Sequence, residues 1–351
     1  PSKESRLRLL EAALAAGVGW VDLEWEAGEA SLARMVRVAG PGRVLVSHHL
    51  YHPRWEEAEI RKLLAAMAAT PAHGVKLALA VEDVSQLREV RALGEFFFKK
   101  FDKPLVLVPM CGAGVVGRVL YPQLHSAWTY AAATAAVATA PGQLTVEELA
   151  AMGVPHDKGQ SPPLLVLFGE DQVLRSLGPP VYNTLFRHHG LPHVYLPAPT
   201  KDLAAAKEAL LPFGLVGAAV TMPPKDTAAT LVDSLQGDGA KLQSINTLVC
   251  DRAAQRWEGF STDGFGVVAA LGAHLKELGR RADKGRPITA LVLGAGGAAW
   301  AAAFALDQAG VAVSFSARSP EKLRAKGRSI GFLPQKVHPW ERRHEVAWDV
   351  L

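Results

Sequence analysis

The chain has 351 residues, of which 49% are hydrophobic, and 38 basic against 34 acidic side chains give it a net charge of +4. This length predicts two or three domains with full hydrophobic cores. The mild basic excess suits anionic small substrates and does not indicate nucleic acid. No apolar run reaches the eighteen residues of a membrane span, and two cysteines, Cys111 and Cys250, exclude a disulfide framework and favour a reducing compartment.

The first 150 residues alternate strand-like and helix-like stretches. Strands are expected at 20–25, 43–47, 75–80 and 105–108, and helices at 5–16, 55–69 and 81–99. This rhythm predicts βα units and a parallel sheet. An alanine-rich stretch, 131–140, is also expected to be helical. Because the chain opens on Pro1 and stops inside a strand-like run at Leu351, we interpret the sequence as a fragment.

Lys76 lies inside the apolar strand-like run 74–80. A charged lysine costs several kcal/mol to bury, so it must be paired, exposed or held neutral. Few charges lie near Lys76 in the sequence, and a neutral amine is a nucleophile that forms a Schiff base with a carbonyl group. The alternative is a lysine on an edge strand whose ammonium group reaches water.

Two further side chains suit chemistry on such an imine. His49 ends a predicted strand and can move protons at the carbon beside the imine, with His48 as a competitor for that role. Arg118 follows a glycine-rich loop and can bind a substrate carboxylate in a bidentate manner. A surface histidine and a solvated arginine are the structural alternatives.

The motifs of this half together resemble type I 3-dehydroquinate dehydratase. They are Ser47-His48-His49, Val75-Lys76, Met110 to Arg118, Ser126 to Tyr130, and Ala140-Pro141-Gly142-Gln143. The stretch 153–163, rich in proline and glycine, is expected to be a linker. The resemblance implies an incomplete (β/α)₈ barrel over residues 1–152, whose first two strands are absent. It also implies that His49 is the general acid/base, that Lys76 forms the Schiff base, and that the substrate is bound by Arg118, Thr139 and Gln143.

Near the C-terminal end of the sequence, a glycine-rich turn follows a predicted strand at 288–293 and precedes an apolar helix at 298–309. Backbone amides at such a turn bind a pyrophosphate, which makes Gly294, Gly296, Gly297 and Ala298 candidate cofactor-binding residues. The next strand, 311–315, leads to Arg318 and Ser319, where NAD enzymes favour an acidic residue. Arg318 instead suits the 2′-phosphate of NADP, and its structural alternative is a solvated helix start. We expect a truncated NADP-binding Rossmann domain at 286–351.

The segment between these halves resembles the substrate domain of shikimate dehydrogenase, expected at 164–275. The resemblance makes Lys225 and Asp263 the catalytic pair and Ser176, Thr221 and Asn246 substrate-binding residues. Three positions depart from the family pattern, at Gly178, Ala219 and Ser261. Each replaces a side chain that normally hydrogen-bonds the substrate, so shikimate binding is expected to weaken.

The whole chain is thus expected to be an α/β protein with an incomplete barrel, an α/β substrate domain and a truncated Rossmann domain. The leading hypothesis is dehydration of 3-dehydroquinate followed by NADPH-dependent reduction to shikimate. Two alternatives stay open, a quinate/shikimate dehydrogenase with altered substrate and a non-catalytic repressor-like protein. We expect small-molecule substrates, no metal, no nucleic acid and no membrane, in the cytoplasm or, if a transit peptide was lost, in a plastid.

Overall fold

The computed structural model describes residues 2–40, 42–140, 142–152, 162–221, 225–281, 286–345 and 347–351. Most of the expected linker, 153–161, therefore lies outside the described residues. The chain divides into two compact units, Pro1–Val216 and Gly217–Leu351.

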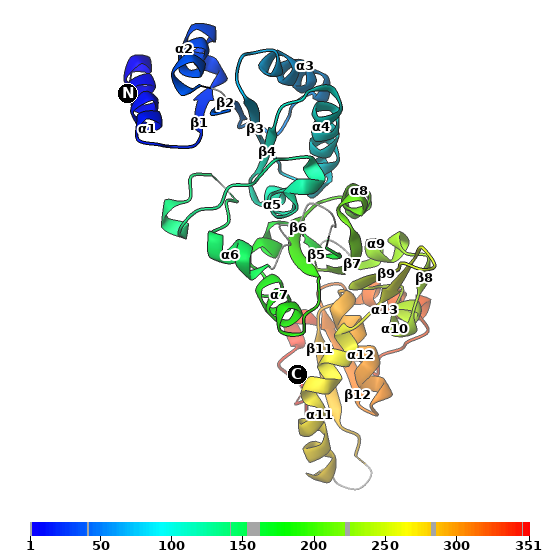
Figure 1. The fold of residues 1–351 in the computed structure, drawn as a ribbon. Coiled ribbons are helices and arrows are strands. Elements are labelled where there is room, and N and C mark those ends of the chain that lie inside the picture. The colour runs from blue at the N-terminus through cyan, green and yellow to red at the C-terminus, as the bar shows by residue number, and fades with distance from the viewer. Residues whose placement is uncertain are drawn as a thin grey trace. The chain divides into compact units, whose positions relative to one another are not determined.

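The first unit begins with four parallel strands in the order β1-β2-β3-β4 (Figure 1). The strands are β1 (Val21–Glu24), β2 (Val44–Leu50), β3 (Gly74–Ala80) and β4 (Leu105–Met110). The helices that alternate with them are α1 (Lys3–Ala15), α2 (Glu29–Ala39), α3 (Glu57–Ala68) and α4 (Leu87–Lys100). Local signals begin several of them. The Ser2 hydroxyl accepts a hydrogen bond from the Ser5 backbone N–H, for example, which caps α1.

The two faces of this sheet differ in chemistry because side chains alternate along each strand. One face is apolar, buried and packed against α2, α3 and α4, and it includes Val44, Val46, Val75, Leu77 and Leu79. The other face carries the polar side chains of three neighbouring strands, Asp22, Glu24, Ser47, His49 and Lys76. A sheet face that only packed against a core would carry apolar side chains. The charged side chains therefore make this face a candidate functional site.

The parallel βα sheet is confirmed. Its four strands form an open sheet, as expected of an incomplete barrel, and the described residues contain no closed ring of strands. Helix α2 had not been predicted. The stretch 131–140 is not an α-helix, because it holds one isolated bridge at Ala132 and a single 3₁₀ turn at Ala135–Val137. Residues 133–139 are exposed, so no packed face stabilises a helix there.

The first unit continues through short helices to a second strand pair. Helices α5 (Val115–Val119) and α6 (Val146–Ala151) precede the parallel strands β5 (Leu164–Gly169) and β6 (Val194–Pro199). Helix α7 (Gly178–His188) connects these two strands, and α8 (Leu203–Leu210) follows β6. Asn183 on α7 is buried and exchanges two hydrogen bonds of 2.8 Å with the backbone of Tyr195 on β6, which fixes the helix against the strand.

The second unit holds a mixed sheet and a parallel one. Strand β7 (Leu215–Val220) crosses the unit boundary and pairs antiparallel with β9 (Thr247–Asp251). Strand β9 pairs antiparallel with β10 (Arg256–Phe260), which pairs in parallel with β8 (Ser234–Leu235). The helices α9 (Lys225–Ala228), α10 (Gly237–Leu242) and α11 (Asp263–Arg281) complete this part.

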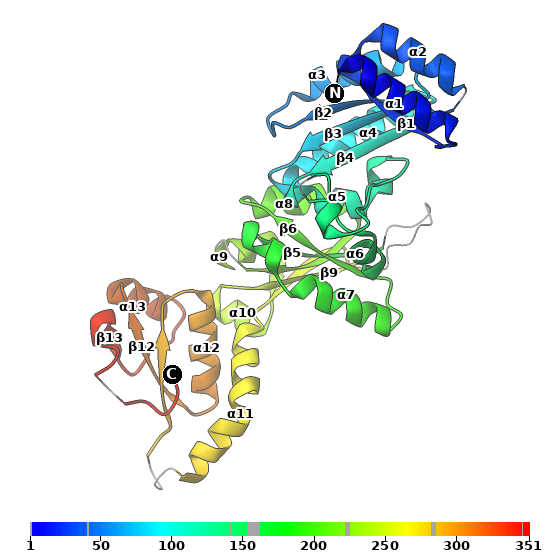
Figure 2. The ribbon, with the colours of Figure 1, turned by 90° about the vertical axis from the view of Figure 1, so that its left-hand side faces the viewer.

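The three-stranded parallel sheet follows the order β11-β12-β13, which is the start of a dinucleotide-binding fold. Its elements are β11 (Thr289–Leu293), α12 (Gly297–Gln308), β12 (Ala312–Ala317), α13 (Pro320–Ser329) and β13 (Val337–Pro339). Helix α12 lies beside α11 in both ribbon views (Figure 2). The Trp300 ring of α12 packs against the Phe315 ring of β12 in the hydrophobic core, with 4.8 Å between the ring centroids.

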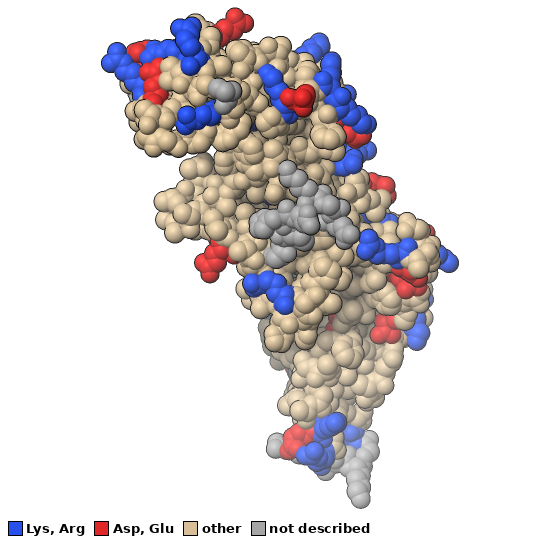
Figure 3. All heavy atoms as spheres, viewed as in Figure 1, with Lys and Arg blue, Asp and Glu red and all other residues tan. Residues whose placement is uncertain are grey.

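Charges of both signs are interspersed on the face that Figure 3 shows, in keeping with the small net charge. Helices α1 and α2 illustrate this mixing, since the Arg34 guanidinium lies 2.7 Å from Glu11 and 2.8 Å from Glu4. None of the helices in the described part of the chain combines the length and apolar character that a bilayer-spanning segment requires.

Candidate active sites

The polar face of the first sheet is organised around an ion pair. Lys76 Nζ donates to Asp22 Oδ2 at 2.6 Å, and the Lys76 side chain is only 14% exposed. The Tyr130 ring lies beside the amine, with its centroid 5.2 Å from Nζ. Lys76 had been expected to be a neutral amine with few charges near it. The structure corrects this, because a carboxylate holds the amine in place.

Sequence reasoning did not select Asp22 as a site residue. The two partners are 54 positions apart, and they meet because β1 and β3 flank β2 in one parallel sheet. The available signal was a carboxylate in a strand whose neighbouring positions, Val21 and Leu23, are apolar and buried.

His49 lies on the same sheet face, and its ring stacks on Tyr51 with 5.9 Å between centroids. Burial lowers the pKa of His49 below its ordinary value, and the positive charge of Lys76 lowers it further. His49 is therefore held as a neutral base near the amine. Its rival His48 instead contacts the Glu26 carboxylate. A cavity of about 390 Å³ opens beside Asp22, Ser47 and His49.

Arg118 is a buried cation on α5, with 2% of its surface exposed. Its Nε donates to the Pro109 carbonyl at 2.7 Å, whereas Nη2 has no hydrogen-bond partner among the described residues. Burial lowers the pKa of Arg118 to about 10. A buried guanidinium with an unsatisfied N–H group is costly unless an anion pairs with it, so the side chain is suited to a substrate carboxylate.

Thr139 and Gln143 contact each other on the turn that follows residues 131–138. The Gln143 Oε1 accepts a 2.7 Å hydrogen bond from the Thr139 backbone N–H and one of 3.1 Å from its hydroxyl. Within the described ranges, no hydrogen bond joins this pair to Lys76 or Arg118. The turn packs closely against the backbone at Cys111, because a Cβ added at Gly142 would lie 2.3 Å from the Cys111 carbonyl oxygen.

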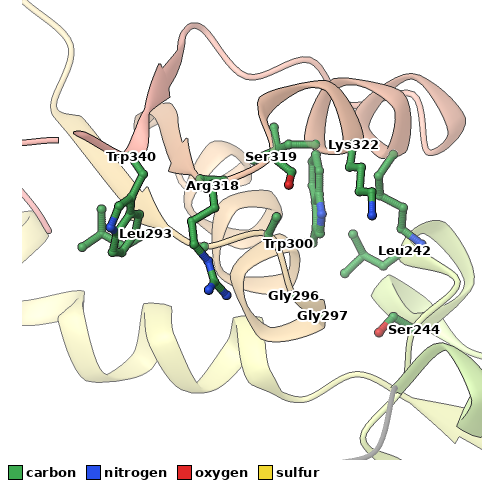
Figure 4. Close-up of a pocket in the computed structure, with 15 residues that line it drawn as sticks. Leu242, Ser244, Leu293, Gly296, Gly297, Trp300, Arg318, Ser319, Lys322 and Trp340 are labelled. Atoms are coloured by element: carbon green, nitrogen blue, oxygen red, sulfur yellow. The ribbon is translucent and has the colours of Figure 1, made fainter. Parts of the chain in front are cut away.

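A second candidate site lies at the carboxyl end of the β11-β12-β13 sheet. A cavity of about 850 Å³ is lined by the expected glycine turn and by the basic end of β12 (Figure 4). Gly294 has φ = +105°, and a Cβ at Gly294 or Gly296 would meet nothing within 4 Å. The backbone thus turns sharply into α12 and stays open to a ligand. The N–H groups of a first helical turn lack intrahelical acceptors, which suits a pyrophosphate.

The basic wall of this cavity carries the predicted NADP-binding residues. Arg318 and Ser319 follow β12, and Lys322 and Lys326 follow on α13, all four lining the cavity. Figure 4 shows the Arg318 side chain extending toward the glycine turn. The wall is therefore positively charged where a dinucleotide would place its phosphates. Ala298 follows Gly297 in the first turn of α12, at the position that the sequence predicted.

Asp263 begins α11 and is oriented by a neighbouring amide. The Asn246 side-chain amide donates to Asp263 Oδ1 at 2.7 Å and to the Thr262 hydroxyl at 3.0 Å. The Asn246 side-chain oxygen Oδ1 accepts a hydrogen bond from the Thr262 backbone N–H at 3.0 Å. The structure thus brings together Asp263 and Asn246, two of the residues that the motifs singled out.

The other residues predicted for the shikimate dehydrogenase-like part lie at separate positions in the structure. Lys225 is the first residue of α9, and its side chain lies outside the described residues, as do residues 222–224. Thr221 follows β7 and is half-buried. In the first unit, the Ser176 hydroxyl accepts a hydrogen bond from the Gly178 backbone N–H at 3.1 Å. Among the described residues, no group of three metal-ligating side chains is present.

Two family models match the chain. Residues 1–152 match the type I 3-dehydroquinase model, and residues 167–248 match the shikimate dehydrogenase substrate binding domain. A shikimate dehydrogenase (NADP(+)) from Acidiphilium cryptum is 41% identical over 181 residues, which cover 50% of this chain and 60% of the relative. The chain thus spans less than two thirds of the length of this relative.

Solved structures resemble the chain in part. The dehydroquinate dehydratase and shikimate dehydrogenase of S. pombe AroM are similar over 96% of this chain and 63% of that chain, with 24% identity and a TM-score of 0.41. A shikimate 5-dehydrogenase from Thermus thermophilus, solved with NADP(H) and shikimate, is 30% identical, with a TM-score of 0.41 over 52% of this chain and 65% of that chain. From the two family matches, the chain joins a type I 3-dehydroquinase domain at residues 1–152 to a shikimate dehydrogenase substrate-binding domain at residues 167–248.

Proposed function

We propose that the protein carries out two consecutive steps, the dehydration of 3-dehydroquinate to 3-dehydroshikimate and the NADPH-dependent reduction of that ketone to shikimate. The observation that carries the first step is the meeting of an amine, a carboxylate and a neutral imidazole on one sheet face, at Lys76, Asp22 and His49. The family matches to both halves support the same pair of activities. Cys111 and Cys250 are both free, which favours a reducing compartment such as the cytoplasm.

In the first step, Lys76 forms an imine with the substrate ketone and releases water. The Lys76 ammonium must lose a proton before the amine can attack the ketone. The Asp22 carboxylate, 2.6 Å from Nζ, can accept this proton. The imine acidifies the adjacent C–H bond, His49 removes that proton and transfers it to the neighbouring hydroxyl, and the hydroxyl then leaves as water. Hydrolysis of the imine returns the free amine. Arg118 binds the substrate carboxylate through its unsatisfied Nη2, with Thr139 and Gln143 as further substrate-binding residues.

In the second step, Lys225 and Asp263 act at the ketone. NADPH, when bound, supplies the hydride. The protein must then place a proton on the nascent alkoxide, which is the role assigned to the Lys225–Asp263 pair. Asn246 orients Asp263 for this role through the 2.7 Å hydrogen bond, and Ser176 and Thr221 bind the substrate. Gly294, Gly296, Gly297 and Ala298 hold the pyrophosphate, and Arg318 and Ser319 hold the 2′-phosphate.

Borohydride trapping tests the first step directly. The full chain is mixed with 3-dehydroquinate and sodium borohydride, and the modified peptide is identified by mass spectrometry. We expect a reduced adduct on Lys76 that disappears in Lys76→Met. Lys99→Met is the matched control and should keep the adduct, because Lys99 is 70% exposed and pairs with Glu95. An unmodified Lys76 in the unaltered chain contradicts the proposal.

The second step is tested by NADPH oxidation with 3-dehydroshikimate. Asp263→Asn should lower the rate by about 100-fold, in the range that general acid–base groups contribute. Arg318→Ala should raise the KM for NADPH while leaving that for NADH unchanged. A chain that oxidises NADH and NADPH equally well would contradict the role of Arg318.

A further inference from the structure

A tryptophan at the end of β13 forms part of the dinucleotide cavity. Trp340 follows Pro339 directly, begins the short 3₁₀ helix Trp340–Arg342, and lines the cavity together with Leu293 and Arg318. Figure 4 shows Trp340 and Leu293 at one end of the view and Leu242 and Ser244 at the other, with Arg318 between them. No motif in the sequence drew attention to Trp340.

The ring of Trp340 is held in place by Arg343. The Arg343 Nη1 donates to the Trp340 carbonyl at 2.7 Å, and its guanidinium carbon lies 4.6 Å from the centroid of the indole ring. One side of the ring is therefore covered by a cation, and the ring remains half-buried where it meets the cavity. A partly exposed indole fixed in one orientation is a rigid apolar surface.

The position of the phosphate-binding groups indicates what this surface meets. The glycine turn suits the pyrophosphate and Arg318 suits a phosphate on the adenosine ribose, so the attached adenine must lie close to Arg318. The cavity has two tryptophans that could contact it. Trp300 is only 2% exposed and packs against Phe315 and Phe332, so its ring is occupied by the core. Trp340 remains, and Leu293, which is 40% exposed, lines the same cavity.

We propose that the Trp340 indole is the platform on which the adenine base of the dinucleotide stacks, with Leu293 completing the apolar contact. The inference rests on the proposed NADP site and adds a residue that recognises the base rather than the phosphates. Aromatic side chains bind nucleobases in this way because every base presents a flat π face.

The test is calorimetric binding to the full chain, with NADPH and with each half of the dinucleotide. Trp340→Ala should raise the Kd for NADPH and for adenosine 2′-monophosphate about tenfold, since one base stack contributes this much. The Kd for nicotinamide mononucleotide should not change. Trp340→Phe keeps a flat ring and should weaken binding less than threefold. Trp20→Ala, in the first unit, removes an equally large aromatic side chain that lies outside the cavity and should have no effect.

The outcomes that contradict adenine stacking on Trp340 differ from those that contradict NADP binding. If Trp340→Ala leaves both adenine-containing ligands unaffected while the unaltered chain binds them, the platform is overturned and the NADP site stands. Equal weakening of adenosine 2′-monophosphate and nicotinamide mononucleotide also overturns it, because the substitution would then disturb the whole cavity. If the unaltered chain binds neither NADPH nor adenosine 2′-monophosphate, the cofactor assignment itself fails and the platform fails with it. Far-UV circular dichroism of each variant checks that the fold is kept.

Discussion

Lys76 on β3 and Asp22 on β1 form a 2.6 Å ion pair across the intervening strand β2. The pair places a carboxylate beside an amine that must lose a proton before it can attack a carbonyl group. In the proposed reaction Asp22 accepts that proton, whereas a structural partner would only hold Lys76 in place.

Asp22→Asn should slow imine formation at Lys76 roughly 100-fold, because the amide cannot accept the amine's proton as a carboxylate does. The rate of borohydride-trapped adduct formation with 3-dehydroquinate measures this. Glu57→Gln on α3 is the matched control, since Glu57 pairs with Arg61 and its helix packs on the apolar face of the sheet. A trapping rate within twofold of the unaltered chain would leave Asp22 with a structural role alone.

The pKa of His49 should rise in Lys76→Met. Burial is the largest cause of the lowered pKa of His49, and the positive charge of Lys76 is the next largest. Removing that charge should therefore move the pKa of His49 back toward its ordinary value. An NMR titration of the His49 ring in both proteins measures the difference. An unchanged or lower pKa in Lys76→Met would show that the two side chains do not interact.

The same shift predicts the pH dependence of the unaltered enzyme. A histidine whose folded-state pKa is lowered binds protons more weakly in the folded than in the unfolded chain. Its contribution to stability is therefore complete above the unfolded value of about 6.5 and is lost as the pH falls through the lower folded value. The acid limb of kcat/KM for dehydration should follow that folded pKa and lie below 6.5. A limb centred above 6.5 would exclude His49 as the base.

Arg118→Met should weaken substrate binding strongly without unfolding the protein. Burial lowers the pKa of the guanidinium to about 10, and its Nη2 is unsatisfied among the described residues, so the fold gains little from the charge. Replacing a buried charge with an apolar side chain of similar volume is often neutral or stabilising. We expect the Kd for 3-dehydroquinate to rise at least 30-fold, the equivalent of ~2 kcal/mol, with an unchanged Tm. A Tm lowered by more than about 5 °C would show that Arg118 supports the fold.

Gly178→Ser should improve the use of shikimate. An added Cβ would lie 3.3 Å from the Ser176 Oγ and 3.5 Å from the Tyr195 ring, so a serine fits after a small movement of the Ser176 hydroxyl. One restored hydrogen bond of ~1 kcal/mol should lower the KM for shikimate about fivefold. Gly178→Ala supplies the Cβ without the hydroxyl and should not lower it. Equal effects of serine and alanine would assign the change to packing.

Several features could be read from local sequence because their causes are local. The βα alternation follows from hydrophobic periodicity, and the glycine turn before α12 follows from a backbone that must turn sharply at Gly294. Helix α2 also left a signal that was not used. Its buried residues Leu32, Met35 and Ala39 recur with helical spacing.

The alanine-rich stretch 131–140 shows where local propensity fails. Alanine favours a helix, but a short helix needs an apolar face packed against the rest of the protein. Here the chain runs as an exposed segment between Tyr130, which lies beside Lys76, and the turn at Gly142.

The sequence by itself determined which half of the chain carries the candidate Schiff-base lysine and which carries the glycine turn, because motif residues lie close together along the chain. Only the tertiary structure decided that Lys76 meets Asp22, that Arg118 is buried with an unsatisfied N–H group, and that Trp340 lines the cavity. The physical reason is that these contacts join residues tens of positions apart, which parallel strand order and helix packing bring together.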